Sequence, residues 1–295
     1  MTTTAELKAA RRQRREAALA LREHMSPAGP APERLRVATW NVNSLKARTP
    51  AVRRFLERAR PDVLLLQETK STEVAPVAAT VFAELGYSVV HSGSGPYNGV
   101  AIAALHPISE VVASADLDDE HLAREPRLVA CVVNAPEPIR VVSVYVPHGR
   151  EVGHWHYDYK LAFLGALRDK VAEWVGEGPI VLGGDVNVAP TDSDIFHPDA
   201  FVGLTHVTEP ERQALEAVLD AGLVDLDAQR WGPRERRFTW WNHGLSYSRN
   251  LGMRIDMLAA DAGLAARLST TWIDHLERGR ERPSDHAALI ADFER

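Results

Sequence analysis

The chain has 295 residues, of which 45% are hydrophobic, 25% are charged and one is cysteine. This length can bury one large core, and a single cysteine excludes a framework of intrachain disulfides. No apolar run approaches the roughly 20 residues that a membrane-spanning helix needs, and the N-terminus lacks the order of a secretory signal. We therefore expect a cytoplasmic protein without a membrane segment. The net charge of −6 neither supports nor excludes a polyanionic partner, because it does not locate the charges.

Residues 1–34 are predicted to be an arm that precedes the main domain. Residues 5–24 are rich in Ala, Leu, Glu and Arg, which favour a helix. They contain a run of basic residues: Arg11, Arg12, Arg14 and Arg15. Prolines at positions 27, 30 and 32 then end any helix. The favoured interpretation is a frayed or disordered tail, and the alternative is a basic arm that contacts a phosphate backbone.

Residues 35–295 alternate between short apolar runs and segments with helical spacing, and we expect one domain there. The runs typical of buried strands are 36–40, 62–68, 100–105, 127–133, 139–146, 179–185, 237–241, 254–260, 268–273 and 286–293. Helical spacing occurs at 49–60, 73–85 and 154–176. A capping box from Thr208 to Glu211 opens a further helix, which Gly222 ends. This alternation predicts an α/β fold of two packed sheets covered by helices, with Cys131 as a buried thiol.

Polar residues gather where the predicted strands end. The segments are Trp40–Asn43, Gln67–Lys70, Tyr145–Gly149, Gly183–Asn187, Arg254–Asp256 and Pro283–His286. In α/β folds, chemistry gathers where strands end and loops begin. Carboxylates and amides without thiolates are ligands for Mg²⁺ or Mn²⁺ rather than for structural zinc. Each segment alone is a weak signal, since Asn and Asp also form turns.

Taken in order, these segments resemble the exonuclease III branch of the endonuclease/exonuclease/phosphatase family. The matching motifs here are NVNSL, LQETK, YVP, GDVN, RID and SDH, and the resemblance extends over about residues 35–294. It implies a four-layered α/β sandwich, with two packed mixed β-sheets flanked by helices and a site at one edge. It also implies a monomeric Mg²⁺- or Mn²⁺-dependent exodeoxyribonuclease or AP endonuclease. Such an enzyme cleaves DNA at abasic sites and removes nucleotides or blocking groups from 3′ ends during repair.

The resemblance also implies a set of metal ligands. Glu68 matches the principal ligand of the family. Asn41, Asn43 and Asp285 match positions that bind the metal directly or through water. Asn43 could instead be an ordinary turn residue.

Five further positions match the catalytic residues of the family. His286 matches the histidine beside the scissile phosphate, and Asp256 matches the carboxylate that orients it. Asp185 matches the residue that activates water, Asn187 matches the residue that fixes it, and Tyr145 matches a phosphate contact. The chemistry supports these roles, because phosphodiester hydrolysis places negative charge on oxygens that a cation or a donating histidine stabilises. The residues leave open the reverse assignment, with His286 as the base and protonated Asp185 as the acid.

DNA is the expected substrate because three segments resemble the repair branch: LQETK, RFTWW and the run from Arg249 to Asp256. Trp240 is predicted to line a pocket for a flipped-out abasic sugar, with Met253 and Ile255 as walls. Core packing is the alternative for Trp240 and Trp241. The other candidate DNA contacts are Lys46, Arg48, Lys70, His148, Lys160, Arg249 and Asn250.

Two departures from the family pattern bear on substrate choice. His148 follows Tyr-Val-Pro where relatives carry Asn or Gln, so binding could depend on pH. The loop 242–248 is short and lacks the charges common there. The alternatives are a phosphoesterase for small molecules or lipid headgroups and a catalytically silent DNA-binding protein. The motifs specify the reaction better than the balance of exonuclease, abasic-site and 3′-phosphatase activities.

Overall fold

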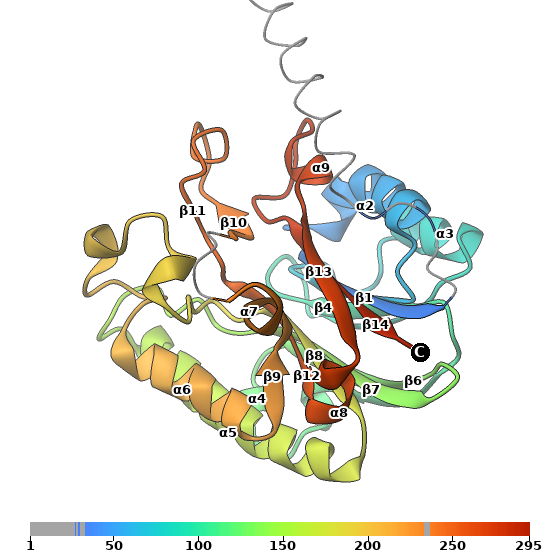
Figure 1. Cartoon of the computed structure of the whole chain (residues 1–295), viewed down its shortest axis with the longest axis horizontal. Helices are drawn as coiled ribbons and strands as arrows, with labels where there is room; N and C mark the ends of the chain where they lie inside the picture. The colour runs from blue at the N-terminus through green and yellow to red at the C-terminus, as the bar shows by residue number, and fades with distance from the viewer. Residues whose placement is uncertain (1–26, 28, 30–32, 233–236) are drawn as a thin grey trace, which may run out of the picture.

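Two mixed β-sheets face each other at the centre of the structure, a computed structural model that describes residues 27, 29, 33–232 and 237–295. Within this described part, each large sheet has six strands, and a pair of short strands, β10 (Trp240–Trp241) and β11 (Gly252–Met253), stands apart (Figure 1). The helix and arginine run expected within residues 1–24 lie outside the described residues. No described helix is long and apolar enough to cross a membrane.

The first sheet is built around one parallel pair of strands. Its order is β13-β14-β1-β2-β4-β3, in which β1 and β2 run parallel and the other neighbours run antiparallel. The strands are β1 (Arg34–Asn41), β2 (Val63–Gln67), β3 (Ser88–Ser92), β4 (Val100–Ala104), β13 (Leu268–Asp274) and β14 (Ala288–Glu294). Parallel neighbours need a crossover connection, which the helix α2 (Leu45–Ala59) supplies between β1 and β2.

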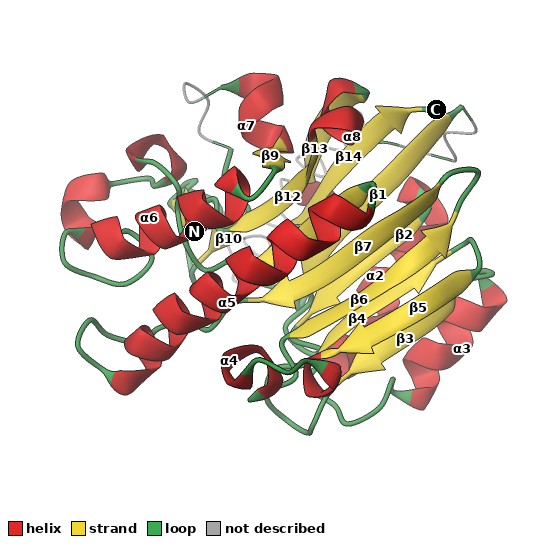
Figure 2. Ribbon diagram, turned by 90° about the horizontal axis from the view of Figure 1, so that it is seen from below, coloured by secondary structure: helices red, strands yellow, loops and turns green. Residues whose placement is uncertain are grey.

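The second sheet repeats this plan. Its order is β5-β6-β7-β8-β12-β9, with β7 and β8 as the parallel pair. The strands are β5 (Ile108–Ala113), β6 (Leu128–Asn134), β7 (Pro138–Tyr145), β8 (Ile180–Asp185), β9 (Leu223–Asp225) and β12 (Asp256–Asp261). The long helix α5 (Trp155–Glu177) connects β7 to β8 and lies across the outer face of this sheet (Figure 2).

Helices cover the outer faces of both sheets, so the protein has four layers. The helices α2 and α3 (Pro76–Glu84) pack on the first sheet, and α5 and α6 (Glu209–Asp220) pack on the second. A third apolar cluster fills the space between the sheets and includes Val37, Leu65, Val141, Val181 and Leu258. The expected four-layered sandwich is therefore confirmed, and Cys131 is buried between the sheets.

The first helix starts earlier than its sequence indicates. The helical spacing predicts a helix over 49–60. A proline lacks the N–H that a helix interior uses. The helix instead begins at Leu45 after the cap Ser44, with Pro50 inside it. The Thr49 hydroxyl donates to the carbonyl oxygens of Leu45 and Lys46, 2.9 and 3.4 Å away, so the carbonyl that Pro50 leaves without a donor still has one. The capping box from Thr208 to Glu211 is confirmed at the start of α6.

Several short elements have no clear sequence signal. They include the strands β3, β5 and β9, whose residues are mostly half-buried or exposed and therefore lack a continuous apolar run. They also include α4 (Glu120–Ala123), α7 (Leu226–Trp231), α8 (Ala262–Ala266), α9 (His275–Arg278) and the 3₁₀ turns Ser114–Asp116, Asp192–Asp194 and Pro198–Phe201. The strand expected over 237–241 is reduced to two residues, β10.

Lys160 was expected to contact phosphate, and that expectation is wrong. Its side chain is fully buried between α5 and α6, where it forms an ion pair with the equally buried Glu211. The Glu211 carboxylate also accepts hydrogen bonds from the Thr205 hydroxyl and the backbone N–H of His206. Burial opposes its charge, but the Lys160 ammonium lowers the pKa of Glu211 to about 2. The pair therefore ties α5 to α6 and does not face a ligand.

Replacing Lys160 with methionine should lower the free energy of unfolding by about 3–5 kcal/mol, because Glu211 then keeps a buried charge without a cation. Denaturant unfolding followed by tryptophan fluorescence measures the change. Adding Glu211→Gln should recover part of the loss, since the unpaired charge is removed. A loss below about 1 kcal/mol in the single variant would contradict a dry ion pair.

Candidate active site

The candidate site lies at one edge of both sheets, where the strand ends identified in the sequence meet. Asn41 ends β1 beside Gln67 at the end of β2, and Tyr145 ends β7 beside Asp185 at the end of β8. The strand β12 runs antiparallel to β8, so its first residue, Asp256, is the register partner of Asp185. Strand direction and register therefore bring polar residues that are distant in sequence to one edge.

The two sheets approach each other closely behind this edge. A Cβ atom on Gly183 would lie 2.6 Å from Leu258 Cδ2 in its own sheet, and 2.7 Å from Leu65 Cδ1 and 3.3 Å from Thr39 Cβ across the interface, so a larger residue there would displace these side chains. Gln67 Nε2 donates to Thr39 Oγ1 within its own sheet and to Ser143 Oγ in the other, both at 3.1 Å. This close contact allows side chains from different sheets to meet at the edge.

Asn41 joins the two sheets directly. Its fully buried amide Nδ2 donates to Glu68 Oε1 and to Asp185 Oδ2, each at 2.9 Å. Its Oδ1 accepts the backbone N–H of Asn43 at 3.0 Å. Two carboxylates from different sheets are therefore held on one amide group, which reduces the repulsion between them.

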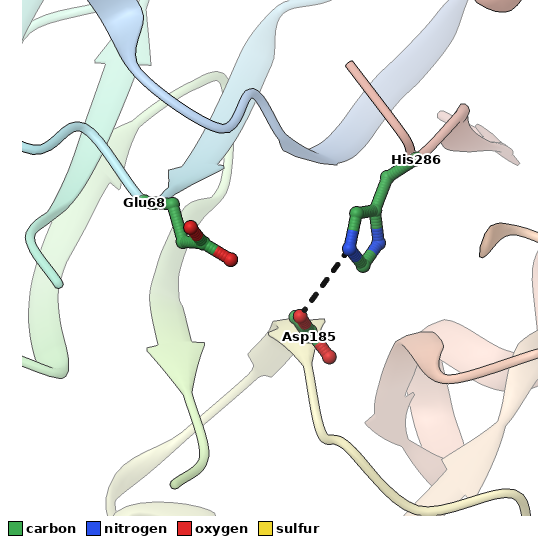
Figure 3. Close-up of side chains that lie close together, drawn as sticks. All are labelled: Glu68, Asp185 and His286. Carbon is green, nitrogen blue, oxygen red and sulfur yellow. Dashed lines mark ion pairs between the residues drawn. The ribbon is translucent and has the colours of Figure 1, made fainter. Parts of the chain in front are cut away.

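Glu68, Asp185 and His286 point toward a common centre (Figure 3). Each offers one possible ligand atom, and these atoms all lie within 4.8 Å of one another. His286 Nδ1 lies 2.8 Å from Asp256 Oδ2, and its Nε2 lies 3.7 Å from Asp185 Oδ2. Asp256 thereby sets the ring orientation, so that Nε2 faces Asp185.

The charges of this group set its protonation. Burial raises the pKa of Asp185 to about 7; the Asp256 charge adds to the rise, while His286 and the Asn41 hydrogen bond oppose it. Burial lowers the pKa of His286, but the carboxylates of Asp256 and Asp185 outweigh that effect and bring it to about 10. At neutral pH the histidine is thus charged, and Asp185 is the group that can change its protonation.

Asn187 and Tyr145 both lie next to Asp185. The backbone N–H of Asn187 donates to Asp185 Oδ1 at 3.0 Å, and its Nδ2 donates to the Val146 carbonyl at 2.9 Å. Burial raises the pKa of Tyr145 well above its usual value, and the charges of Glu68 and Asp185 raise it further. The Arg127 guanidinium lies 4.8 Å from the centre of the Tyr145 ring. Tyr145 is therefore a neutral phenol beside two carboxylates.

A second polar group borders Glu68. Lys70 Nζ lies 2.6 Å from Glu68 Oε2 and donates to Asn43 Oδ1 at 2.6 Å. Asn43 Nδ2 in turn donates to Asp285 Oδ1 at 3.0 Å. Burial opposes ionisation, but Lys70 and Asn41 hold the pKa of Glu68 below its usual value. The oxygens of these carboxylates and amides suit a hard divalent cation. In this structure the Lys70 ammonium lies beside the Glu68 carboxylate and balances its charge.

Trp240, Met253 and Ile255 come together as expected. Met253 and Ile255 are buried in a small apolar cluster with Ile195, and the half-buried Trp240 packs against it. Trp240 pairs with Met253 across β10 and β11, and its Nε1 donates to Asp285 Oδ2 at 3.2 Å. Trp241 is fully buried in the core between the sheets. The two tryptophans therefore have different environments, and Trp240 is the one beside the polar site.

The remaining candidate DNA contacts differ in exposure and in their partners. Lys46, His148, Arg249 and Asn250 are exposed, and Arg48 is half-buried. Asn250 Oδ1 accepts a hydrogen bond from Trp241 Nε1 at 3.1 Å, so its amide also braces the loop after β10. Arg48 donates to the carbonyl of Pro283 at 3.2 Å, next to the Ser-Asp-His motif.

Some supporting residues were not identified from the sequence. Thr239 Oγ1 accepts the backbone N–H of Asp256 at 3.1 Å, and Ser284 Oγ donates to the Asn41 carbonyl at 2.6 Å. Arg254 forms buried ion pairs with Asp194 and Asp225. Ser284 and Arg254 belong to the motifs SDH and RID, so the sequence indicated that they lie near the site but not which residues they contact. Their partners are distant in sequence.

Comparisons with known proteins agree with this geometry. The chain is 28% identical over 269 residues to exodeoxyribonuclease III of Haemophilus influenzae, covering 88% of this chain and 100% of that protein. The solved structure of an AP endonuclease from Archaeoglobus fulgidus is similar with a TM-score of 0.83 and 35% identity, covering 88% of this chain and 100% of that one. The solved structure of the 3′ phosphatase NExo from Neisseria, bound to a product DNA hairpin, is similar with a TM-score of 0.82 and 34% identity. It covers 88% of this chain and 100% of that one.

Residues 38–286 match the Endonuclease/Exonuclease/phosphatase family. This range includes every motif quoted from the sequence, from Asn41 to His286. The side chains of those motifs meet at one edge of the paired sheets. The chain belongs to the endonuclease/exonuclease/phosphatase family.

Proposed function

We propose that this chain is a divalent-metal-dependent DNA phosphodiesterase of the exonuclease III type. It would incise DNA at abasic sites and remove nucleotides or blocking groups from 3′ ends during repair. The observation that carries this proposal is the convergence of Glu68, Asp185 and His286 at one edge, with atoms within 4.8 Å of one another. The relatives are an exodeoxyribonuclease III, an AP endonuclease and a 3′ phosphatase bound to DNA, which supports DNA as the substrate.

The protonation of the site supports one assignment of the acid and base roles. His286 carries its charge because Asp256 lies 2.8 Å behind it. A charged imidazole cannot accept a proton, but it can donate a hydrogen bond to a phosphate oxygen. Asp185, with a pKa raised to about 7, can accept the proton of an attacking water. We therefore assign Asp185 as the general base and His286 as the stabiliser of the phosphate.

The oxygen ligands around Glu68 fit Mg²⁺ or Mn²⁺. Glu68 would hold the ion, with Asn41, Asn43 and Asp285 contributing directly or through water. The bound ion would stabilise negative charge on the phosphate oxygens. Asn41 keeps Glu68 next to Asp185, so a phosphate bound there would lie between the metal ligand and the base.

The apolar cluster beside the site supports a preference for abasic DNA. Trp240 is half-buried and lies beside Met253, next to Asp285. An abasic sugar presents an apolar face to such a surface, whereas an intact nucleotide must also be unstacked. Action as a monomer in the cytoplasm remains a prediction.

The metal requirement is tested by replacing Glu68 with glutamine. Turnover should fall to near background, because an amide lacks the charge that a hard cation needs. The assay uses Mg²⁺ with abasic duplex, blunt duplex, single strand, 3′-phosphate duplex and inositol phosphates. Glu73→Gln, at an exposed position in the following loop, is the matched control and should behave as wild type. Full turnover in excess EDTA would show that no metal is required. Activity confined to inositol phosphates would show that the substrate is a small phosphoester and not DNA.

Asp185→Asn and His286→Ala should each lower kcat by at least about a thousandfold, because each removes proton transfer or charge stabilisation. The double variant should lose less than the two single losses combined, since both residues act on one phosphate. A base must be deprotonated, so wild-type activity should decline as the pH falls through the pKa of Asp185 at saturating metal. Small, additive losses with an unchanged pH profile would show that these residues are bystanders.

Trp240→Ala should reduce kcat/KM at abasic sites by about 1–3 kcal/mol in transition-state stabilisation, the range of aromatic contacts to nucleotides. The loss on a 3′-phosphate duplex should be much smaller. Trp240→Phe keeps an aromatic face but loses the N–H that reaches Asp285, so it should stay close to wild type on abasic DNA. Equal losses on both substrates, or a large loss in the phenylalanine variant, would mean that Trp240 supports Asp285 and does not read the lesion.

A further inference from the structure

Two histidines lie side by side on the outer side of Asn187. His148 follows β7 and is exposed, and His206 is half-buried in the loop before α6. Their Nε2 atoms are 3.2 Å apart, and their rings meet edge to face with centroids 4.5 Å apart. The other ring nitrogen of His206, Nδ1, contacts the backbone carbonyl oxygen of Asn187.

The partners of the two rings determine which nitrogens carry protons. His148 Nδ1 accepts the backbone N–H of Arg150 at 3.1 Å, so in the neutral ring the proton is on Nε2. A carbonyl oxygen can only accept, so His206 Nδ1 carries a proton and donates it to Asn187. His206 Nε2 is then the acceptor for His148 Nε2–H. The result is a one-directional chain of hydrogen bonds from Arg150 through both histidines to Asn187.

The same tautomers argue against a metal ion shared by the two rings. A ligating His148 Nε2 would need its proton on Nδ1, which already accepts the Arg150 N–H. Burial and the nearby Lys160 ammonium lower the pKa of His206 to about 3, which agrees with a neutral ring. The geometry therefore favours a hydrogen-bonded pair.

His206 is fixed more firmly than a typical loop residue. Its backbone has a φ of 80°, an unusual value for a residue with a side chain. The N–H of His206 donates to Glu211 Oε1 at 2.9 Å, and its carbonyl accepts the N–H of Ala189 at 2.8 Å. The strained conformation is thus held from both sides.

His206 contacts the backbone of Asn187. It also has a left-handed backbone, with a φ of 52°. Its carbonyl accepts from His206 and, at 2.7 Å, from Lys160 Nζ. Its N–H donates to Asp185 Oδ1 at 3.0 Å. The Asn187 backbone therefore holds one oxygen of the Asp185 carboxylate, while the Asn41 amide holds the other.

We propose that His206, supported by His148, is a positioning residue that orients Asp185 through the backbone of Asn187. This inference rests on the proposed function, because it assigns Asp185 the role of general base. It also gives His148 a role other than the phosphate contact expected from the sequence. A phosphate contact acts mainly on binding, whereas a positioning residue acts mainly on turnover.

The test compares variants of His206 that keep or remove the donor. The Asn side chain can place an N–H near the position of Nδ1, and asparagine tolerates a positive φ, so His206→Asn should stay within about threefold of wild type. His206→Leu should lower kcat about tenfold, the order expected from losing one hydrogen bond, with KM changed less than about twofold. Rescue by asparagine separates the donor and the tolerance of a positive φ from packing of the imidazole ring.

His148 is tested in the same way on abasic duplex. Glutamine can supply a donor near Nε2, so His148→Gln should preserve kcat, whereas His148→Leu should lower it by a few-fold. His106→Leu is the control, because His106 is a partly exposed histidine that contacts Asp62 at the opposite end of the first sheet, and this variant should keep the wild-type kcat. A rise in KM that weakens with added salt, with kcat unchanged, would assign His148 to phosphate binding and overturn its positioning role.

Nitrogen-15 NMR of the histidine rings in wild type tests the inference independently of activity. The expected result is a neutral His206 protonated on Nδ1 and a neutral His148 protonated on Nε2. A proton on Nε2 of His206 would overturn the proposal even if the enzyme cleaves DNA as proposed. Conversely, a wild type that cleaves no DNA but shows these tautomers would refute the function and leave the hydrogen-bond chain in place. Loss of kcat in both the leucine and the asparagine variants of His206 would likewise reject the donor role.

Discussion

The site depends on one amide group that holds two carboxylates from different sheets. Glu68 follows a strand of the first sheet, Asp185 ends a strand of the second, and Asn41 Nδ2 donates to both at 2.9 Å. Two negative charges held on the same amide group would repel each other strongly in a buried site. Hydrogen bonds to one amide, with Lys70 on one side and His286 on the other, make the arrangement stable. The two sheets approach each other closely at Gly183, where a side chain would meet Leu65 and Thr39 of the first sheet.

The same arrangement separates the pKa values of the two carboxylates. Glu68 has a lysine beside it and stays ionised, whereas Asp185 is buried next to Asp256 and has a raised pKa. Two carboxylates on one bridge thereby acquire different chemical roles, one suited to a cation and one to a proton. Asp256 contributes to both effects, since it raises the pKa of Asp185 and keeps His286 charged.

Much of the fold and most of the site could be predicted because the relevant signals are local. Continuous apolar runs identify the buried strands, and Glu68 and Asp185 lie where two of these runs end, so strand order and register bring them together. The resemblance of the motifs to the family implied their roles. Short edge strands such as β5 have no such run. Lys160 was misassigned because its partner, Glu211, lies 51 residues away, and only the packing of two helices reveals the pair. His206 belongs to no motif, so its contact with Asn187 is visible only in three dimensions.

The residues that hold Asp185 in place also contribute to the stability of the fold. Glu211 caps α6 and pairs with Lys160; Lys160 also donates to the Asn187 carbonyl, and Asn187 holds Asp185. Each of these groups is polar and largely buried, so removing one leaves a partner without its hydrogen bond. A substitution at one of these supporting residues can therefore disturb both the unfolding equilibrium and the position of Asp185. Loss of Lys160 should lower the free energy of unfolding more than loss of His206, because Lys160 forms a buried ion pair and His206 donates a hydrogen bond to a neutral carbonyl. We therefore expect loss of Lys160 to affect mainly stability, and loss of His206, in its proposed positioning role, to affect mainly the orientation of Asp185.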